Sequence, residues 1–175
     1  MTLIQETVAN GNSSISFGSI AGTYKQLLLT FQGLYHTSSG TAFALRLNNS
    51  SASEYSSQAW GFNNASPTNQ AISTTTTNLY FPQGTFGEEA TSTTTHQTVT
   101  GNILIDNYAS STKYKTYYGY RAFRFNAGAG EPTYHTCVGT WGNTSAITSL
   151  DIVRTQGSGN LSNISNTSIR LYGIS

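Results

Sequence analysis

The residues that could do chemistry are few and scattered along this chain. The three histidines, His36, His96 and His135, are far apart and lack the short spacings that build a zinc site. The single cysteine, Cys137, lies two residues from His135, which would place both side chains on one face of a strand. We interpret this pair as a small buried thiol beside a partly covered imidazole. A transition-metal site or a thiol nucleophile is the alternative.

The seven acidic residues do not form an evident catalytic pair. A glycosidase needs two facing carboxylates, whereas Glu88 and Glu89 are sequence neighbours that a strand would point to opposite faces. Asp106 and Asp151 each end or interrupt an apolar strand, where an acid usually pairs with Arg or with a turn amide. The sequence contains no Gly-x-Ser-x-Gly elbow and no phosphate-binding loop. We therefore predict no catalytic residue, no metal and no cofactor, and not an enzyme.

The composition also limits the partners that the chain could bind. Charged residues make up 9% of the sequence and the net charge is +1, while Ser, Thr and Asn together account for 65 of the 175 residues. So small a positive charge cannot neutralise many phosphates, so we expect no binding to nucleic acid and no recruitment to an anionic membrane. The N-terminus lacks the basic and apolar regions of a signal peptide, which favours synthesis in a cytoplasm without export.

The elements that must position these residues are strands. Polar and apolar residues alternate with a period of two, for example at Leu27, Leu29 and Phe31, and in the long candidate strand Lys113 to Phe125 with a bend at Gly119. About ten strands with short turns, and no helix, predict an all-β fold made of antiparallel sheets. A β-sandwich of jelly-roll type is the first choice and a Greek-key barrel the second. We expect one domain over residues 1–175, with a loop-rich excursion at about 49–96.

Aromatic residues are the one enriched class with binding potential, at 12% of the chain. Trp141 closes an alternating strand and is predicted to lie in the core. Trp60 could equally be buried or exposed, and the neighbouring or loop-flanking residues Phe62, Tyr80 and Phe81 could join it as contacts. Tyrosine and tryptophan suit sugar stacking and protein interfaces alike, because they combine an apolar face with a polar tip.

The order of the strand motifs resembles that of small virion proteins of tailed bacteriophages. The motifs span most of the chain, except for the variable stretch between about residues 49 and 96. They include Leu3-Ile4-Gln5-Glu6-Thr7, Ala44-Leu45-Arg46-Leu47-Asn48, Ile105-Asp106-Asn107-Tyr108, Gly139-Thr140-Trp141 and the closing Leu171-Tyr172-Gly173-Ile174. The resemblance implies a β-sandwich component of the particle that decorates the capsid or belongs to a tail fibre, and it supplies no catalytic residues.

Two hypotheses of function follow from this resemblance. The first is a capsid cement (decoration) protein that is found in the virion, contacts the major capsid protein through loops and its N-terminal strand at Leu3 and Ile4, and forms a homo-oligomer, expected to be a trimer. The second is a tail-fibre or receptor-binding module that stacks a host-surface glycan on Trp60, Tyr80 or their neighbours. A glycan-cleaving enzyme is a third class, but it requires an acidic pair that the sequence does not offer.

Overall fold

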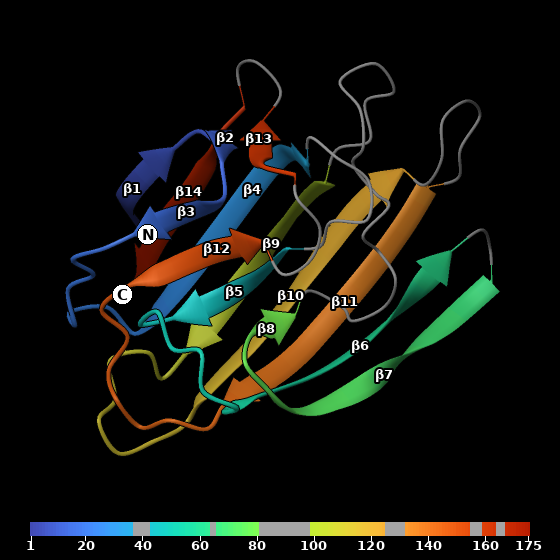
Figure 1. Ribbon diagram of the computed structural model, residues 1–175. Helices are drawn as coiled ribbons and strands as arrows, with labels where there is room; N and C mark the ends of the chain where they lie inside the picture. The colour runs from blue at the N-terminus through green and yellow to red at the C-terminus, as the bar shows by residue number, and fades with distance from the viewer. Residues whose placement is uncertain (37–42, 64–65, 81–98, 125–131, 155–158, 164–166) are drawn as a thin grey trace.

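Alternating polar and apolar residues form β-strands throughout the computed structural model (Figure 1). The structure describes residues 1–36, 43–63, 66–80, 99–124, 132–154, 159–163 and 167–175. In the strand that contains residues 115–123, burial alternates at every residue, as expected when one face meets a core and the other meets water. Over these ranges, no helix is long and apolar enough to cross a membrane.

The described residues form fourteen strands. In chain order they are β1 (Thr2–Thr7), β2 (Asn10–Asn12), β3 (Ser14–Phe17), β4 (Gln26–His36), β5 (Phe43–Leu47), β6 (Tyr55–Asn63), β7 (Ser66–Thr76), β8 (Leu79–Tyr80), β9 (Val99–Asp106), β10 (Lys115–Arg124), β11 (Pro132–Trp141), β12 (Leu150–Arg154), β13 (Leu161–Asn163) and β14 (Ile169–Ile174).

These strands build two antiparallel sheets of unequal size. The large sheet has the order β1-β14-β4-β9-β10-β11-β6-β7, with β13 pairing β4 and β2 pairing β13 beside this path. The small sheet has the order β3-β12-β5-β8. Figure 1 shows the small sheet lying across one face of the large sheet, so that each sheet keeps an inner and an outer face. The predicted antiparallel β-sandwich is confirmed.

The path of the chain between the sheets is that of a jelly roll. The chain changes sheet at each step from β3 to β4, β5 and β6, and again from β7 to β8 and β9. The small-sheet order β3-β12-β5-β8 then faces β4-β9 and β6-β7 of the large sheet, which is the order of two nested Greek keys. The hairpin β10-β11 is inserted between β9 and β6, and β14 and β1 extend the far edge. This insertion widens the large sheet well beyond the small one.

The core lies between the inner faces of the two sheets. Its members are apolar side chains that are each at most 4% exposed: Ile15, Phe17, Leu45, Leu47, Leu150 and Ile152 from the small sheet, and Leu27, Leu29, Phe31, Ile103, Ile105, Tyr117 and Trp141 from the large one. Burying one such side chain stabilises the fold by about 1.5–3 kcal/mol. The predicted core position of Trp141 is confirmed.

Rings packed over glycines are a recurring feature of the large sheet. The cross-strand partners Tyr117 and Gly139, His135 and Gly61, and Phe31 and Gly101 each pair a ring with a glycine. A Cβ at any of these glycines would collide with the ring of its partner or with neighbouring backbone. Each glycine therefore makes room for a ring to lie flat on the inner face, an arrangement that also pins the register of the strands.

A buried lysine, Lys115, holds the loops at one end of the sandwich. Lys115 Nζ donates to the carbonyl oxygens of Ser110 at 2.6 Å, Thr144 at 2.8 Å and Lys113 at 3.0 Å. The side chain is 1% exposed, and this burial lowers the pKa of Lys115. Three carbonyl acceptors satisfy all three ammonium protons, which explains how a lysine can face the interior.

Three elements differ in detail from what the strand pattern alone indicates. β10 keeps its register through Gly119, so the expected bend there involves no β-bulge; a Cβ at this position would collide with the Asn102 carbonyl oxygen, which accounts for the glycine. The described part of the expected excursion, residues 49–63 and 66–80, is largely strand, because β6, β7 and β8 fall in it. A strand could be expected from the alternation that starts at Ala146, but β12 begins only at Leu150, since Asn48 Oδ1 accepts the backbone N–H groups of Thr148 at 2.8 Å and Ser149 at 3.2 Å.

Candidate functional site

His135 and Cys137 lie together on the inner face of β11, so the prediction that they share a strand face is confirmed. The imidazole is fully buried rather than partly covered, because Gly61 leaves room for it and the Phe123 ring packs against it, with 5.5 Å between ring centroids. Burial, helped by the Arg121 charge, lowers the pKa of His135 to about 4, and burial raises the pKa of Cys137 to about 12. A neutral imidazole beside a protonated thiol suits packing rather than nucleophilic attack.

The described glutamates hold the structure together. Glu54 Oε2 accepts the indole N–H of Trp141 at 3.0 Å and the Asn143 amide at 3.2 Å. Glu6 pairs with Arg170 across β1 and β14 at 2.9 Å. The remaining glutamates, Glu88, Glu89 and Glu131, and also His96, lie outside the described residues.

The two aspartates lie on different sheets. Asp106 ends β9 in the large sheet and accepts the backbone N–H of Asn107 at 2.9 Å, the kind of turn amide that the sequence indicated. Asp151 lies in β12 of the small sheet, between Ser16 and Arg46 in the strand register. Within the described ranges, no group of three or more His, Cys, Asp or Glu residues could hold a metal ion. The two aspartates therefore do not share a sheet.

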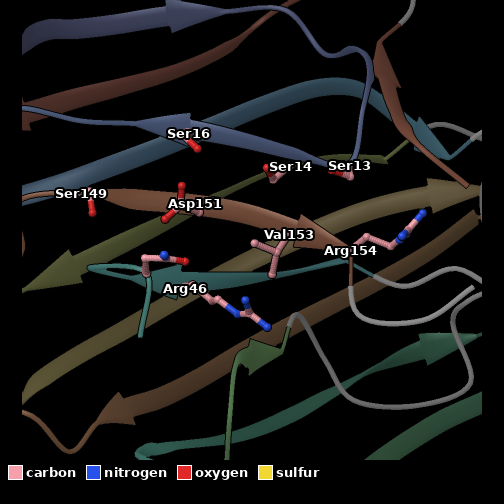
Figure 2. Close-up of a pocket in the computed structure, with 9 residues that line it drawn as sticks. Ser13, Ser14, Ser16, Arg46, Ser149, Asp151, Val153 and Arg154 are labelled. Carbon is pink, nitrogen blue, oxygen red and sulfur yellow. The ribbon is translucent and has the colours of Figure 1, made fainter. Parts of the chain in front are cut away.

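A polar groove of about 500 Å³ runs over the outer face of the small sheet. Figure 2 shows Asp151 and Arg154 on β12, Arg46 on β5, and serines from β3 and its approach along this groove. Both arginines are engaged with the protein itself, since Arg46 Nε donates to Asn78 Oδ1 at 2.5 Å and Arg154 Nη1 to the Gly159 carbonyl at 3.0 Å. Asp151 offsets part of their charge. The groove has the character of a hydrated surface rather than of an anion site.

The outer face of the large sheet is different, because it carries large aromatic side chains in open water. Trp60 on β6 and Tyr134 on β11 are each 44% exposed, Tyr118 on β10 is 53% exposed, and Tyr120 is 36% exposed. The rings of Tyr120 and Tyr134 stack with their centroids 5.9 Å apart. So many exposed rings on one face are a mark of a contact surface rather than of ordinary solvent exposure.

The strand register orders these rings into rows across the outer face. Tyr118 lies between Leu104 on β9 and Val138 on β11, and Tyr120 lies between Asn102 and Thr136, with Trp60 next in the same row. Four such rows cross β9, β10, β11 and β6, from the one that contains Asp106 to the one that contains Thr100. Among their outward-facing residues only Asp106 is charged. The face is therefore aromatic, hydroxyl-rich and almost free of charge.

The six residues predicted as contacts do not form one site. By element they are Leu3 and Ile4 on β1, Trp60 and Phe62 on β6, Tyr80 on β8, and Phe81, which lies outside the described residues. β1 and β6 lie toward opposite sides of the large sheet, with five strands between them, and β8 belongs to the small sheet (Figure 1). The described residues among them therefore lie at three separate places.

Two of the predicted contacts are open to solvent. Leu3 is 48% exposed on the edge strand, while Ile4 is partly buried and packs against the core. Trp60, which could have been buried or exposed, is 44% exposed. The side chains of Phe62 and Tyr80 are not among those described.

The sequence analysis did not single out Tyr118, Tyr120 and Tyr134, which the structure shows to be exposed. The signal was present in part, because the alternation in Lys113 to Phe125 places Tyr118 and Tyr120 on one face, away from Tyr117. Periodicity alone did not indicate that this face points outward. Compared with models of known families, with curated proteins and with solved structures, the chain matches none of them.

Proposed function

We propose that this chain is a non-enzymatic structural component of a tailed-phage particle, made in the host cytoplasm and added to the capsid surface as a cement (decoration) protein. The resemblance in the order of its strand motifs supports this proposal. The sandwich architecture is compatible with it, since a wide sheet and a low charge suit a part that is held by its neighbours. The expected partners are the major capsid protein and further copies of the chain, with a trimer as the assembly.

The observation that carries this proposal is the open edge at β1. Among the described strands only β14 pairs with β1, so one side of β1 offers unpaired backbone N–H and C=O groups. Exposed apolar side chains lie on this strand and at its two ends: Leu3 is 48% exposed, Met1 before the strand is 75% exposed, and Val8 after it is 54% exposed. An edge strand flanked by exposed apolar residues is a template for pairing with another chain. We infer that β1 attaches the protein to its neighbour in the particle.

The test of this function is the composition of the particle. Purified capsids without tails should retain the protein in hundreds of copies, as a surface lattice requires. A handful of copies per particle, all lost together with the tail, would contradict the proposal.

The test of the attachment edge is a substitution at Leu3. Leu3→Lys introduces a charge that opposes strand pairing, and it should lower the number of copies per capsid without loss of thermal stability. Tyr114→Ala, at a residue that is 61% exposed and lies before β10, is the matched control and should leave the copy number unchanged.

A second candidate is a tail-fibre or receptor-binding module that recognises a host-surface glycan, and the exposed aromatic face favours it. The isolated protein should then bind host cells, and Trp60→Ala should weaken binding by an amount equivalent to about 1 kcal/mol, a typical value for aromatic stacking. No detectable binding to host cells or to their isolated glycans would count against this candidate.

A further inference from the structure

A hollow of about 470 Å³ lies on the outer face of the large sheet beside Tyr118. Its floor is apolar, because Leu104 and Val138 flank Tyr118 on the two neighbouring strands. The Tyr118 ring, 53% exposed, forms an open aromatic wall. A pocket of this size with an apolar floor falls within the range of small-molecule sites.

Polar side chains line one end of the hollow as a continuous row. Gln26, Asp106, Thr116 and Thr140 are cross-strand neighbours on β4, β9, β10 and β11. This row offers one carboxylate, one amide and two hydroxyls beside the apolar floor. The carboxylate only accepts hydrogen bonds, whereas the amide and the hydroxyls both donate and accept.

We propose that this hollow is a binding site for a neutral saccharide. A pyranose ring has an apolar face that stacks on a tyrosine ring, and hydroxyls around its edge that both donate and accept hydrogen bonds. A sugar stacked on Tyr118, over Leu104 and Val138, would direct its hydroxyls toward Asp106 and the other polar side chains of the row described above. A sugar hydroxyl that donates to the Asp106 carboxylate makes a charge-assisted hydrogen bond, which is the stronger kind.

The charges of the hollow favour this occupant over two others. The lining residues include one anion, Asp106, and no cation, so an acidic saccharide would meet repulsion. A second copy of the chain packed symmetrically on this face would bring the same patch against itself, with two Asp106 carboxylates and no counter-charge among the lining residues. A neutral ligand rich in hydroxyl donors has neither problem.

This inference goes beyond attachment to a capsid, because it assigns a ligand to a hollow around Tyr118 on β10, which three strands separate from β1. It also adds a saccharide site at Tyr118 to the second candidate function, on the same outer face as Trp60. The two surfaces can be tested separately, since Tyr118→Ala should leave the copy number per capsid unchanged. A failure of saccharide binding would therefore not affect the capsid proposal. A low copy number on the capsid would likewise not affect the saccharide site.

The experiment uses the purified full chain and an array of neutral oligosaccharides of glucose, galactose and mannose, with oligosaccharides of hexuronic acids as charged probes. We expect binding to at least one neutral probe and weaker binding to the charged ones. The dissociation constant for that neutral probe is then measured by calorimetry for variants. Tyr118→Ala should weaken binding about tenfold, which corresponds to about 1.4 kcal/mol. Tyr118→Phe keeps the ring and should stay within about threefold of the unchanged protein.

Tyr114→Ala is the matched control, because it removes an exposed tyrosine that does not line the hollow. It should bind like the unchanged protein, and thermal unfolding of all three variants verifies that they are folded. The site is wrong if no neutral probe binds at millimolar concentration, or if Tyr118→Ala binds as well as Tyr114→Ala. It is also wrong if the protein self-associates in sedimentation experiments, without binding saccharide, and Tyr118→Ala dissociates the oligomer.

Discussion

The two faces of the large sheet both carry aromatic residues, but they use them in opposite ways. On the inner face of β10 and β11, Tyr117 and Trp141 are at most 4% exposed, and Tyr117 is seated over a glycine of the next strand. On the outer face of the same strands, Tyr118, Tyr120 and Tyr134 are between 36% and 53% exposed. Residues next to each other in the sequence thus have unrelated environments.

This comparison separates the aromatic residues that pack in the core from those that are exposed and available for contact. The inner rings fill the space between the sheets, and the Trp141 indole N–H donates to Glu54 Oε2. The outer rings lie in neighbouring rows on a face with almost no charge. Exposed apolar surface of this kind marks a candidate binding surface.

The largest expected effect separates the two tryptophans. Trp141→Ala removes a ring that is 1% exposed and that stacks on Tyr55 with 6.2 Å between centroids. We expect the free energy of unfolding to fall by about 3–5 kcal/mol, measured by urea denaturation. Trp60→Ala, at a residue 44% exposed on the outer face, should cost less than about 1 kcal/mol. Equal losses in both variants would contradict the assignment of the two faces.

A second expected effect is a dependence of stability on pH that arises from the inner face. The pKa of His135 is about 4 in the folded protein, whereas an unfolded histidine titrates near 6.5. Above pH 6.5 both states are neutral and His135 contributes no pH dependence. Between pH 6.5 and 4 the unfolded chain takes up a proton that the folded protein does not, so stability falls as the pH falls, by up to about 3 kcal/mol.

His135→Phe isolates this contribution, because it keeps a ring over Gly61 but cannot bind a proton. Denaturation at a series of pH values should show a flatter curve for the variant than for the unchanged protein between pH 6.5 and 4. Parallel curves would show that His135 is not held neutral inside the fold.

The smallest of the three effects concerns the glycines that seat the inner rings. Gly139→Ala places a Cβ against the Tyr117 hydroxyl and the Ser56 carbonyl oxygen, so we expect a loss of about 1–3 kcal/mol. Gly18→Ala is the control, because no atom lies within 4 Å of a Cβ built there. Thermal unfolding of the two variants measures the difference, and an unchanged melting temperature for Gly139→Ala would mean that this packing is not tight.

Much of the fold could be predicted from the sequence because strand alternation is a local property. The alternation in β10 correctly groups Lys115, Tyr117, Arg121 and Phe123 on one face and Tyr118 and Tyr120 on the other. From polarity alone, the face with Lys115 and Arg121 is expected to be exposed to solvent, yet that face is the buried one. Carbonyl oxygens from the turn before β10 and from the distant loop at Thr144 satisfy Lys115, and such a cage is a property of the assembled structure that a strand pattern does not contain.

The candidate sites were less predictable, because they too depend on how distant strands assemble. The hollow beside Tyr118 draws its lining from β4, β9, β10 and β11, which only the strand order brings together. The short strands β2 and β13 also escaped prediction, since three residues are too few to show a period. Leu3 could be named in advance because it belongs to a terminal strand motif, and such a strand often lies at a sheet edge.

The most direct test of the central claim, that attachment and ligand binding use separate surfaces, is hydroxyl-radical footprinting of the protein when free and when part of the intact particle. We predict that Met1 and Leu3 are labelled in the free protein and protected in the particle, while Tyr118 and Tyr120 stay labelled in both. Protection of the two tyrosines in the particle, with continued labelling at Met1 and Leu3, would contradict the account.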